Sequence, residues 1–87
     1  MGVVPASAIL STVVGDEAVL MNSLSGRYYG LNEVGAQVWR WLCEGAAAET
    51  IPARLVEEYE VDVAEAERDV AALLEDLKAN GLLVDTP

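Results

Sequence analysis

The sequence predicts an α+β fold in which a three-stranded antiparallel meander is followed by three helices, in the order βββααα. Up to residue 31, the chain consists of short runs rich in β-branched and aromatic residues, separated by turns that contain glycine. From residue 32 onward, apolar residues recur every three or four positions, as they do on amphipathic helices. A length of 87 residues is typical of one domain, so we expect a single domain over residues 1–87 with an ordered core at about 8–84.

The strands follow from these runs and from the turns between them. We expect the strands at residues 8–14, 17–22 and 27–31. Gly15 and Asp16 suit a tight hairpin turn, because glycine tolerates a positive φ, and Gly26 ends the second turn. Residues 1–7 predict a loose lead-in, and residues 85–87 predict a frayed tail.

The first helix begins after Asn32, whose side chain can accept a hydrogen bond from a free backbone N–H of the first turn, and Gly45 is expected to end it. Its predicted apolar stripe consists of Val34, Val38, Trp41 and Leu42. Trp39 lies about 200° around the helix from Trp41, so it either packs against the sheet or belongs to an exposed patch. Cys43 is expected to be a buried or half-buried small apolar residue, with a reactive thiol as the alternative.

The second and third helices are joined by a short turn, which is the order of a helix-turn-helix. The second helix should begin near Glu49, because Pro52 is tolerated only in a first helical turn. Its predicted buried face consists of Ile51, Leu55, Val56 and Tyr59. The third helix, at about residues 63–80, is capped by Asp62 and ends before Gly81. Its predicted apolar stripe consists of Ala66, Val70, Leu73, Leu74 and Leu77.

The composition argues against several classes of partner and location. The net charge of -10 repels phosphate backbones, so we expect no nucleic-acid partner. No apolar run approaches the roughly 20 residues that a membrane-spanning helix needs, and the first residues lack the basic start of a signal peptide. We therefore expect no membrane partner. The single cysteine excludes an internal disulfide and fits a reducing compartment, so the expected location is cytoplasmic.

Residues that could carry catalysis or hold a cofactor are scarce. The chain has no histidine, the commonest general base and metal ligand, so a Ser or Cys nucleophile lacks its usual partner. One group of closely spaced carboxylates consists of Asp62, Glu65, Glu67 and Asp69. It lacks the glycine and the alternation of a calcium loop, and it fits helix capping and solvation better. We therefore expect no enzyme activity, no metal and no cofactor, and we interpret the chain as a binding module.

The third predicted strand has the features of such a module. An open meander leaves an edge unpaired, and that edge can accept an extended peptide as an extra strand. Tyr28 and Tyr29 face opposite sides of the strand, so one can join the core while the other faces solvent, a partner or the last helix. A groove between this strand and the last helix would suit alternate side chains of the peptide. The same edge could also pair with a second copy, giving a homodimer.

Several short motifs, taken in order, give the chain a family resemblance. They are Gly26-Arg27-Tyr28-Tyr29-Gly30-Leu31-Asn32; Gly35, Val38 and Trp39; Ile51, Leu55 and Tyr59; and Asp69-Val70, Leu73, Leu77 and Gly81-Leu82-Leu83. Over residues 8–84 this set resembles the PqqD-like family, the recognition elements for precursor peptides of ribosomally made natural products (RiPPs). The run Tyr-Tyr-x-Leu-Asn, followed by Gly and Val-Trp, is most similar to the stand-alone recognition proteins of lasso-peptide clusters.

The resemblance implies a winged helix-turn-helix fold and a protein that holds the leader segment of a precursor peptide. The leader is expected to add as a strand to the third strand and to lie against the third helix. The strand residues implied in peptide binding are Arg27, Tyr28, Tyr29, Gly30 and Leu31. The helix residues implied are Asp69, Val70, Leu73, Leu74, Asp76 and Leu77, with Lys78 as an outward neighbour.

The resemblance also implies partner proteins. A separate leader-peptide cysteine protease would cut the leader, and an ATP-dependent lasso cyclase would close the core peptide. Two other functions stay open, a recognition element of another RiPP class and a winged-helix DNA-binding regulator. The charge argues against the regulator, because the helix that would enter DNA carries only Arg68 and Lys78 beside five acidic residues.

Overall fold

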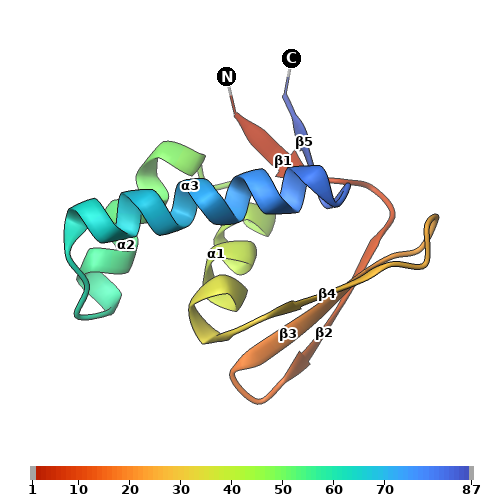
Figure 1. Cartoon of the computed structure of the whole chain (residues 1–87), viewed down its shortest axis with the longest axis horizontal. Coiled ribbons are helices and arrows are strands. Elements are labelled where there is room, and N and C mark those ends of the chain that lie inside the picture. The colour runs from red at the N-terminus through yellow and green to blue at the C-terminus, as the bar shows by residue number, and fades with distance from the viewer. Residues whose placement is uncertain (1, 87) are drawn as a thin grey trace.

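In the computed structural model, which describes residues 2–86, three helices come after a three-stranded sheet in the chain. They cover one face of that sheet (Figure 1). In chain order the elements are β1 (Val3–Pro5), β2 (Ile9–Val14), β3 (Glu17–Asn22), β4 (Tyr28–Leu31), α1 (Glu33–Cys43), the 3₁₀ turn η1 (Ala48–Thr50), α2 (Ile51–Glu58), α3 (Val63–Ala79) and β5 (Leu83–Asp85). The predicted α+β class is confirmed. In the described part of the chain, no helix has the length and apolar character to cross a membrane.

The main sheet has the spatial order β2-β3-β4, so β2 and β4 are its two edges. Alternation along β3 turns Ala18 and Leu20 toward the helices, where they are 4% and 0% exposed. Val19, between them, faces the other way and is 38% exposed. The inner face of the sheet therefore belongs to the core, while the outer face meets solvent.

The two ends of the described chain pair with each other. β1 and β5 form a separate two-stranded antiparallel sheet, in which Val4 lies opposite Val84. Beyond the strands, the Thr86 N–H donates to the Gly2 carbonyl over 2.8 Å. Figure 1 shows the two ends side by side, above the C-terminal end of α3. The edges of the main sheet are therefore left uncovered by the termini.

This pairing corrects two expectations about the ends. The loose lead-in predicted for residues 1–7 and the frayed tail predicted from Asp85 are wrong for the described residues, while Met1 and Pro87 lie outside them. Leu82 and Leu83 are 2% and 3% exposed, so they hold the start of β5 on the core. Its backbone groups then need hydrogen-bond partners, which β1 supplies.

The caps predicted for two helices are confirmed. The Asn32 side chain accepts from the Gly35 N–H over 2.8 Å at the start of α1. The Asp62 side chain accepts from the Ala64 N–H over 3.2 Å at the start of α3. Pro52 lies in the first turn of α2, as predicted. The Asn32 cap places the start of α1 directly after β4, where the candidate site lies.

Helix α1 is covered on two sides. It contacts β1, β3 and β4, and the guanidinium of Arg54 on α2 lies 5.0 Å from the centre of the Trp41 ring. Trp39 and Trp41 are therefore both buried, at 6% exposed each, although they point in different directions. The alternative in which Trp39 belongs to an exposed patch is wrong.

Three positions predicted on apolar or buried faces are exposed, and the first is Val34, which is 36% exposed in the first turn of α1. Val56 is 38% exposed, because the short helix α2 packs through Ile51 and Leu55 on its opposite side. Cys43 is exposed because it is the last residue of α1. Partial burial of its thiol, together with the charge of Glu44, raises the pKa of Cys43.

Candidate functional site

The outer edge of β4 carries backbone groups that no strand among residues 2–86 uses, because β4 pairs only with β3 there. The Asn22 N–H donates to the Arg27 carbonyl over 2.9 Å, which marks Arg27 as a hydrogen-bonded position of the ladder. Such positions alternate along an antiparallel pair. The N–H and C=O groups of Tyr28 and Gly30 therefore point away from β3, toward the place of an added strand.

A cavity of about 490 Å³ lies where the end of β4 meets the three helices. We call it the apolar cavity, because its wall includes Leu31, Val34, Leu55 and Leu73. Asp69 is the one charged residue among the described residues that line it. The apolar cavity can therefore bury a large uncharged side chain that enters from the β4 edge.

A second hollow lies further along the same side of α3. We call it the open pocket, and it is lined by Tyr29, Ala72, Leu73, Glu75, Asp76 and Ala79. Tyr29, Ala72 and Leu73 also line the apolar cavity, so the two hollows are continuous. Together they form a groove that β4 flanks on one side and α3 on the other.

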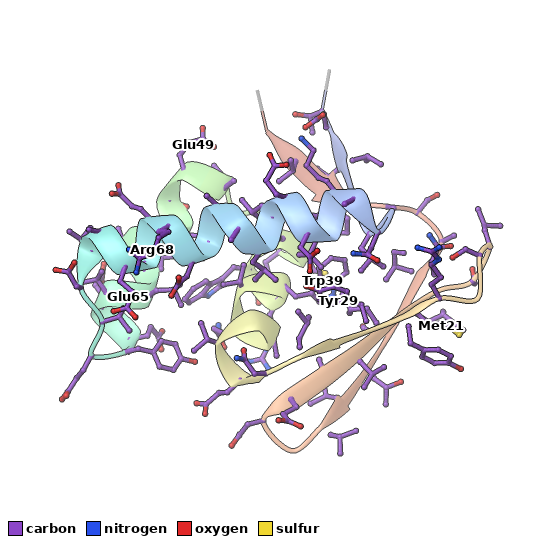
Figure 2. All side chains as sticks on the ribbon, in the orientation of Figure 1. Met21, Tyr29, Trp39, Glu49, Glu65 and Arg68 are labelled. Carbon is purple, nitrogen blue, oxygen red and sulfur yellow. The ribbon has the colours of Figure 1, made fainter. Side chains whose placement is uncertain are left out.

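A hydrogen bond crosses this groove. The Tyr29 hydroxyl donates to the Asp76 carboxylate, and Figure 2 shows the Tyr29 side chain between β4 and α3. The hydrogen bond to Asp76 raises the pKa of Tyr29 to about 12, with added contributions from burial and from the negative charge of Asp76. At neutral pH the phenol therefore keeps its proton, and the link between strand and helix holds.

The two tyrosines of β4 take the opposite sides predicted for them. Tyr29 is half-buried and faces α3, while Tyr28 is 72% exposed on the outer face of the sheet. Tyr29 is therefore the tyrosine that packs against the core, and Tyr28 is the one that faces solvent.

The residues implied in peptide binding fall into two main groups in the structure, those that line the groove and those that belong to the core. Those that line the groove are Tyr29, Gly30, Leu31, Asp69, Leu73 and Asp76. Val70 and Leu77 are 4% and 0% exposed and belong to the core, and the half-buried Leu74 packs against it. Lys78 points elsewhere and pairs with the Asp85 carboxylate over 3.1 Å.

Some groove residues were not among those implied by the sequence. They are Asn32, Val34, Gly35, Leu55, Tyr59, Val61, Ala66, Ala72, Glu75 and Ala79. A usable signal was present on α3, where residues 69, 72, 73 and 76 follow helical spacing and form a stripe of small, acidic and apolar side chains. This stripe lies beside the apolar core stripe and shares Leu73 with it.

The chemistry of these side chains suits binding. Among residues 2–86, no group of three or more Cys, Asp or Glu is arranged to hold a metal ion. The groove combines free backbone amides, an apolar hollow and carboxylates on one rim. Such an arrangement can hold an extended chain through its main chain and sort it by alternate side chains.

Comparison with known proteins gives the same family as the motifs. The family model described as "Coenzyme PQQ synthesis protein D (PqqD)" matches residues 17–83. A search of curated proteins gave no match. The solved structure "TbiB1 in Complex with the TbiA(beta) Leader Peptide" is 34% identical, covers 97% of this chain and 98% of its own, and has a TM-score of 0.90.

A second solved structure also matches almost the whole chain. "Lasso peptide synthetase B1 complexed with the leader peptide" is 32% identical, covers 98% of this chain and 100% of its own, and has a TM-score of 0.87. The family model spans most of the chain, and both structures share its whole fold. This chain therefore belongs to the PqqD family.

Proposed function

We propose that this protein is a non-catalytic recognition element that binds the leader segment of a ribosomally made precursor peptide. The leader would add as a strand to β4 and lie in the groove against α3. The observation that carries the proposal is the unpaired β4 edge beside a lined groove. Two relatives of the same fold, each at least 32% identical, are complexes with a leader peptide.

In this proposal, affinity and selectivity come from different atoms. The N–H and C=O groups of Tyr28 and Gly30 bind the leader backbone, whatever its sequence. Alternate leader side chains face the groove, where Leu31 and Leu73 contact an apolar anchor in the apolar cavity. Tyr29, Asp69 and Asp76 would provide the polar contacts along the groove, while Arg27 flanks the start of the pairing edge.

We propose that the fold is used as a winged helix-turn-helix in which β4 and α3 present the groove to a peptide. Its net charge of -10 favours this use over DNA binding. The bound leader would be delivered in the cytoplasm to a leader-peptide cysteine protease and a lasso cyclase on other chains. Because a second copy at the β4 edge would occupy the same backbone groups, leader binding and a homodimer through that edge would exclude each other.

The test is a titration of ¹⁵N-labelled protein with two peptides, the TbiA(beta) leader and the leader of any precursor encoded beside the gene. We expect amide shifts concentrated in residues 26–31 and 66–78. Shifts confined to other regions, or no binding by either peptide, would reject the proposal. Random duplex DNA at low salt is the control, and a mobility shift with it would favour the regulator instead.

A further inference from the structure

The open pocket differs in charge from the apolar cavity. Its floor consists of Ala72, Leu73 and Ala79, which are apolar and, apart from Leu73, small. Its rim carries the carboxylates of Glu75 and Asp76, and no Lys or Arg is among the described residues that line either hollow. An apolar floor under an acidic rim is a place for a side chain with an apolar stem and a positive head.

The two carboxylates have no counter-ion from the described part of the chain. The ion pairs there join Arg68 to Asp69 over 3.9 Å and Lys78 to Asp85 over 3.1 Å. Asp76 accepts a hydrogen bond from Tyr29, a neutral donor that leaves its negative charge uncompensated. The charge at the open pocket is therefore available to a partner.

The groove geometry connects this pocket to a strand added at β4. Inward-facing residues of such a strand recur every second position, about 6.6 Å apart. Asp69 at the apolar cavity and Asp76 at the open pocket are seven residues apart on α3, a rise of about 10 Å. A peptide residue at the open pocket therefore lies two or four residues from the residue that fills the apolar cavity.

We infer that the open pocket is a subsite for a lysine or arginine side chain of the bound leader, an inference that rests on the proposed leader binding. The aliphatic stem would lie on Ala72, Leu73 and Ala79, and the head would reach the Glu75 and Asp76 carboxylates. An acidic residue would be repelled there. An apolar residue would cover the carboxylates without replacing their hydrogen bonds to water.

The experiment uses the full chain and whichever of the two leader peptides binds it. Each inward-facing position of the peptide is replaced in turn by Lys and by Met, which has a similar length and no charge. We expect one position, two or four residues from the apolar anchor, at which the Lys peptide binds about threefold more tightly than the Met peptide at low salt. This preference should shrink at high salt, because the charges at the pocket are open to solvent.

Substitutions in the protein assign the preference to the pocket. Glu75→Gln should reduce the preference for the Lys peptide. Glu75→Lys should reverse it, so that a peptide with Glu at the same position binds more tightly than the Lys peptide. Glu67→Gln makes the same charge change about 180° around α3 from Asp76, outside both hollows, and should leave the preference unchanged. Asp76 is avoided, because its substitution would also break the link to Tyr29.

The outcomes separate the inference from the proposed function. Equal binding of Lys and Met peptides at every inward position would overturn the inference and leave leader binding intact. The inference also fails if Glu75→Gln keeps the full preference for Lys. A wild-type protein that binds neither leader would overturn both this inference and the proposed function.

Discussion

The two edge strands of the main sheet, β2 and β4, both leave backbone groups unpaired within residues 2–86, yet their surroundings differ. The β2 edge stands in solvent, with Leu10 and Val13 at 57% and 63% exposed. The β4 edge lies beside α3, and Tyr29 bridges the two elements through Asp76. One edge is bare, while the other forms one wall of a groove.

This difference predicts that only the β4 edge of the sheet selects the peptide that it binds. Unpaired backbone groups accept almost any extended chain, so an edge alone provides affinity without selection. A helix alongside adds hollows that favour some side chains over others. We therefore expect the β4 edge to bind peptides according to their amino-acid sequence, and the β2 edge to show no such sequence preference.

The largest loss of leader binding is expected from Gly30→Pro in β4. Proline removes an N–H that points to the added strand, and its ring would clash with the incoming backbone. A side chain at Gly30 would meet no atom within 4 Å, and the N–H is not used by β3, so the fold should survive. We expect leader binding, measured by calorimetry, to fall at least about tenfold from the lost hydrogen bond and the clash.

Ser11→Pro is the matched control on the other edge. The Ser23 N–H donates to the Ala8 carbonyl over 2.8 Å, so alternation turns the Ser11 N–H away from β3 as well. We expect this variant to bind the leader as the wild type does. If Ser11→Pro weakened binding as much as Gly30→Pro, the distinction between the two edges would be wrong.

A smaller loss is expected from Leu73→Ala. Leu73 lines both hollows, so its removal takes apolar contact from a bound side chain, at a cost of about 1–3 kcal/mol in binding free energy. Val56→Ala, on the exposed side of α2, should not change binding. Both variants are first checked by circular dichroism and urea unfolding. Leu73 would count as core alone if its variant lost stability and kept its affinity.

Tyr29→Phe tests the link between β4 and α3. It removes one hydrogen bond, so we expect the free energy of unfolding to fall by about 0.5–1.5 kcal/mol at neutral pH. Tyr28→Phe is the matched control, because Tyr28 is 72% exposed on the outer face. Equal stabilities of the Tyr29→Phe variant and the wild type in urea would show that the link contributes nothing.

The smallest effect is expected from alkaline pH. The pKa of Tyr29 is about 12 in the folded chain, against 10.0 for a free tyrosine. A raised pKa means that the folded state favours the protonated phenol, so its stabilisation is complete below pH 10 and is lost as the pH rises toward 12. The stability difference between wild type and Tyr29→Phe should therefore shrink over this window in urea unfolding. A stability difference that stayed constant from pH 10 to pH 12 would contradict a raised pKa of Tyr29.

The elements of this fold were predictable because their signals are local. The caps at Asn32 and Asp62 and the proline in the first turn of α2 each act within a few residues. The unpaired β4 edge follows from the order of three short strands. The prediction failed at the chain ends because their pairing is long-range, since Gly2 and Thr86 are 84 residues apart in the sequence.

The candidate site was predictable in part. Tyr29, Asp69, Leu73 and Asp76 lie on the groove, as the family resemblance implied. Val70 and Leu77 are core instead, because two neighbouring stripes of α3 are both apolar enough to be buried and only packing decides between them. Ala72 and Ala79 were missed because the only signal of a small side chain is its helical spacing, here to Asp69, Leu73 and Asp76.

The sequence by itself determined the α+β class, the starts of α1 and α3, and the family. Each of these depends on contacts within a few residues or on an ordered set of motifs. Only the tertiary structure decided which side of α3 faces β4, where the two hollows lie and that the chain ends pair. Those features depend on residues such as Tyr29 and Asp76, 47 positions apart, and such contacts form only when the whole core has packed.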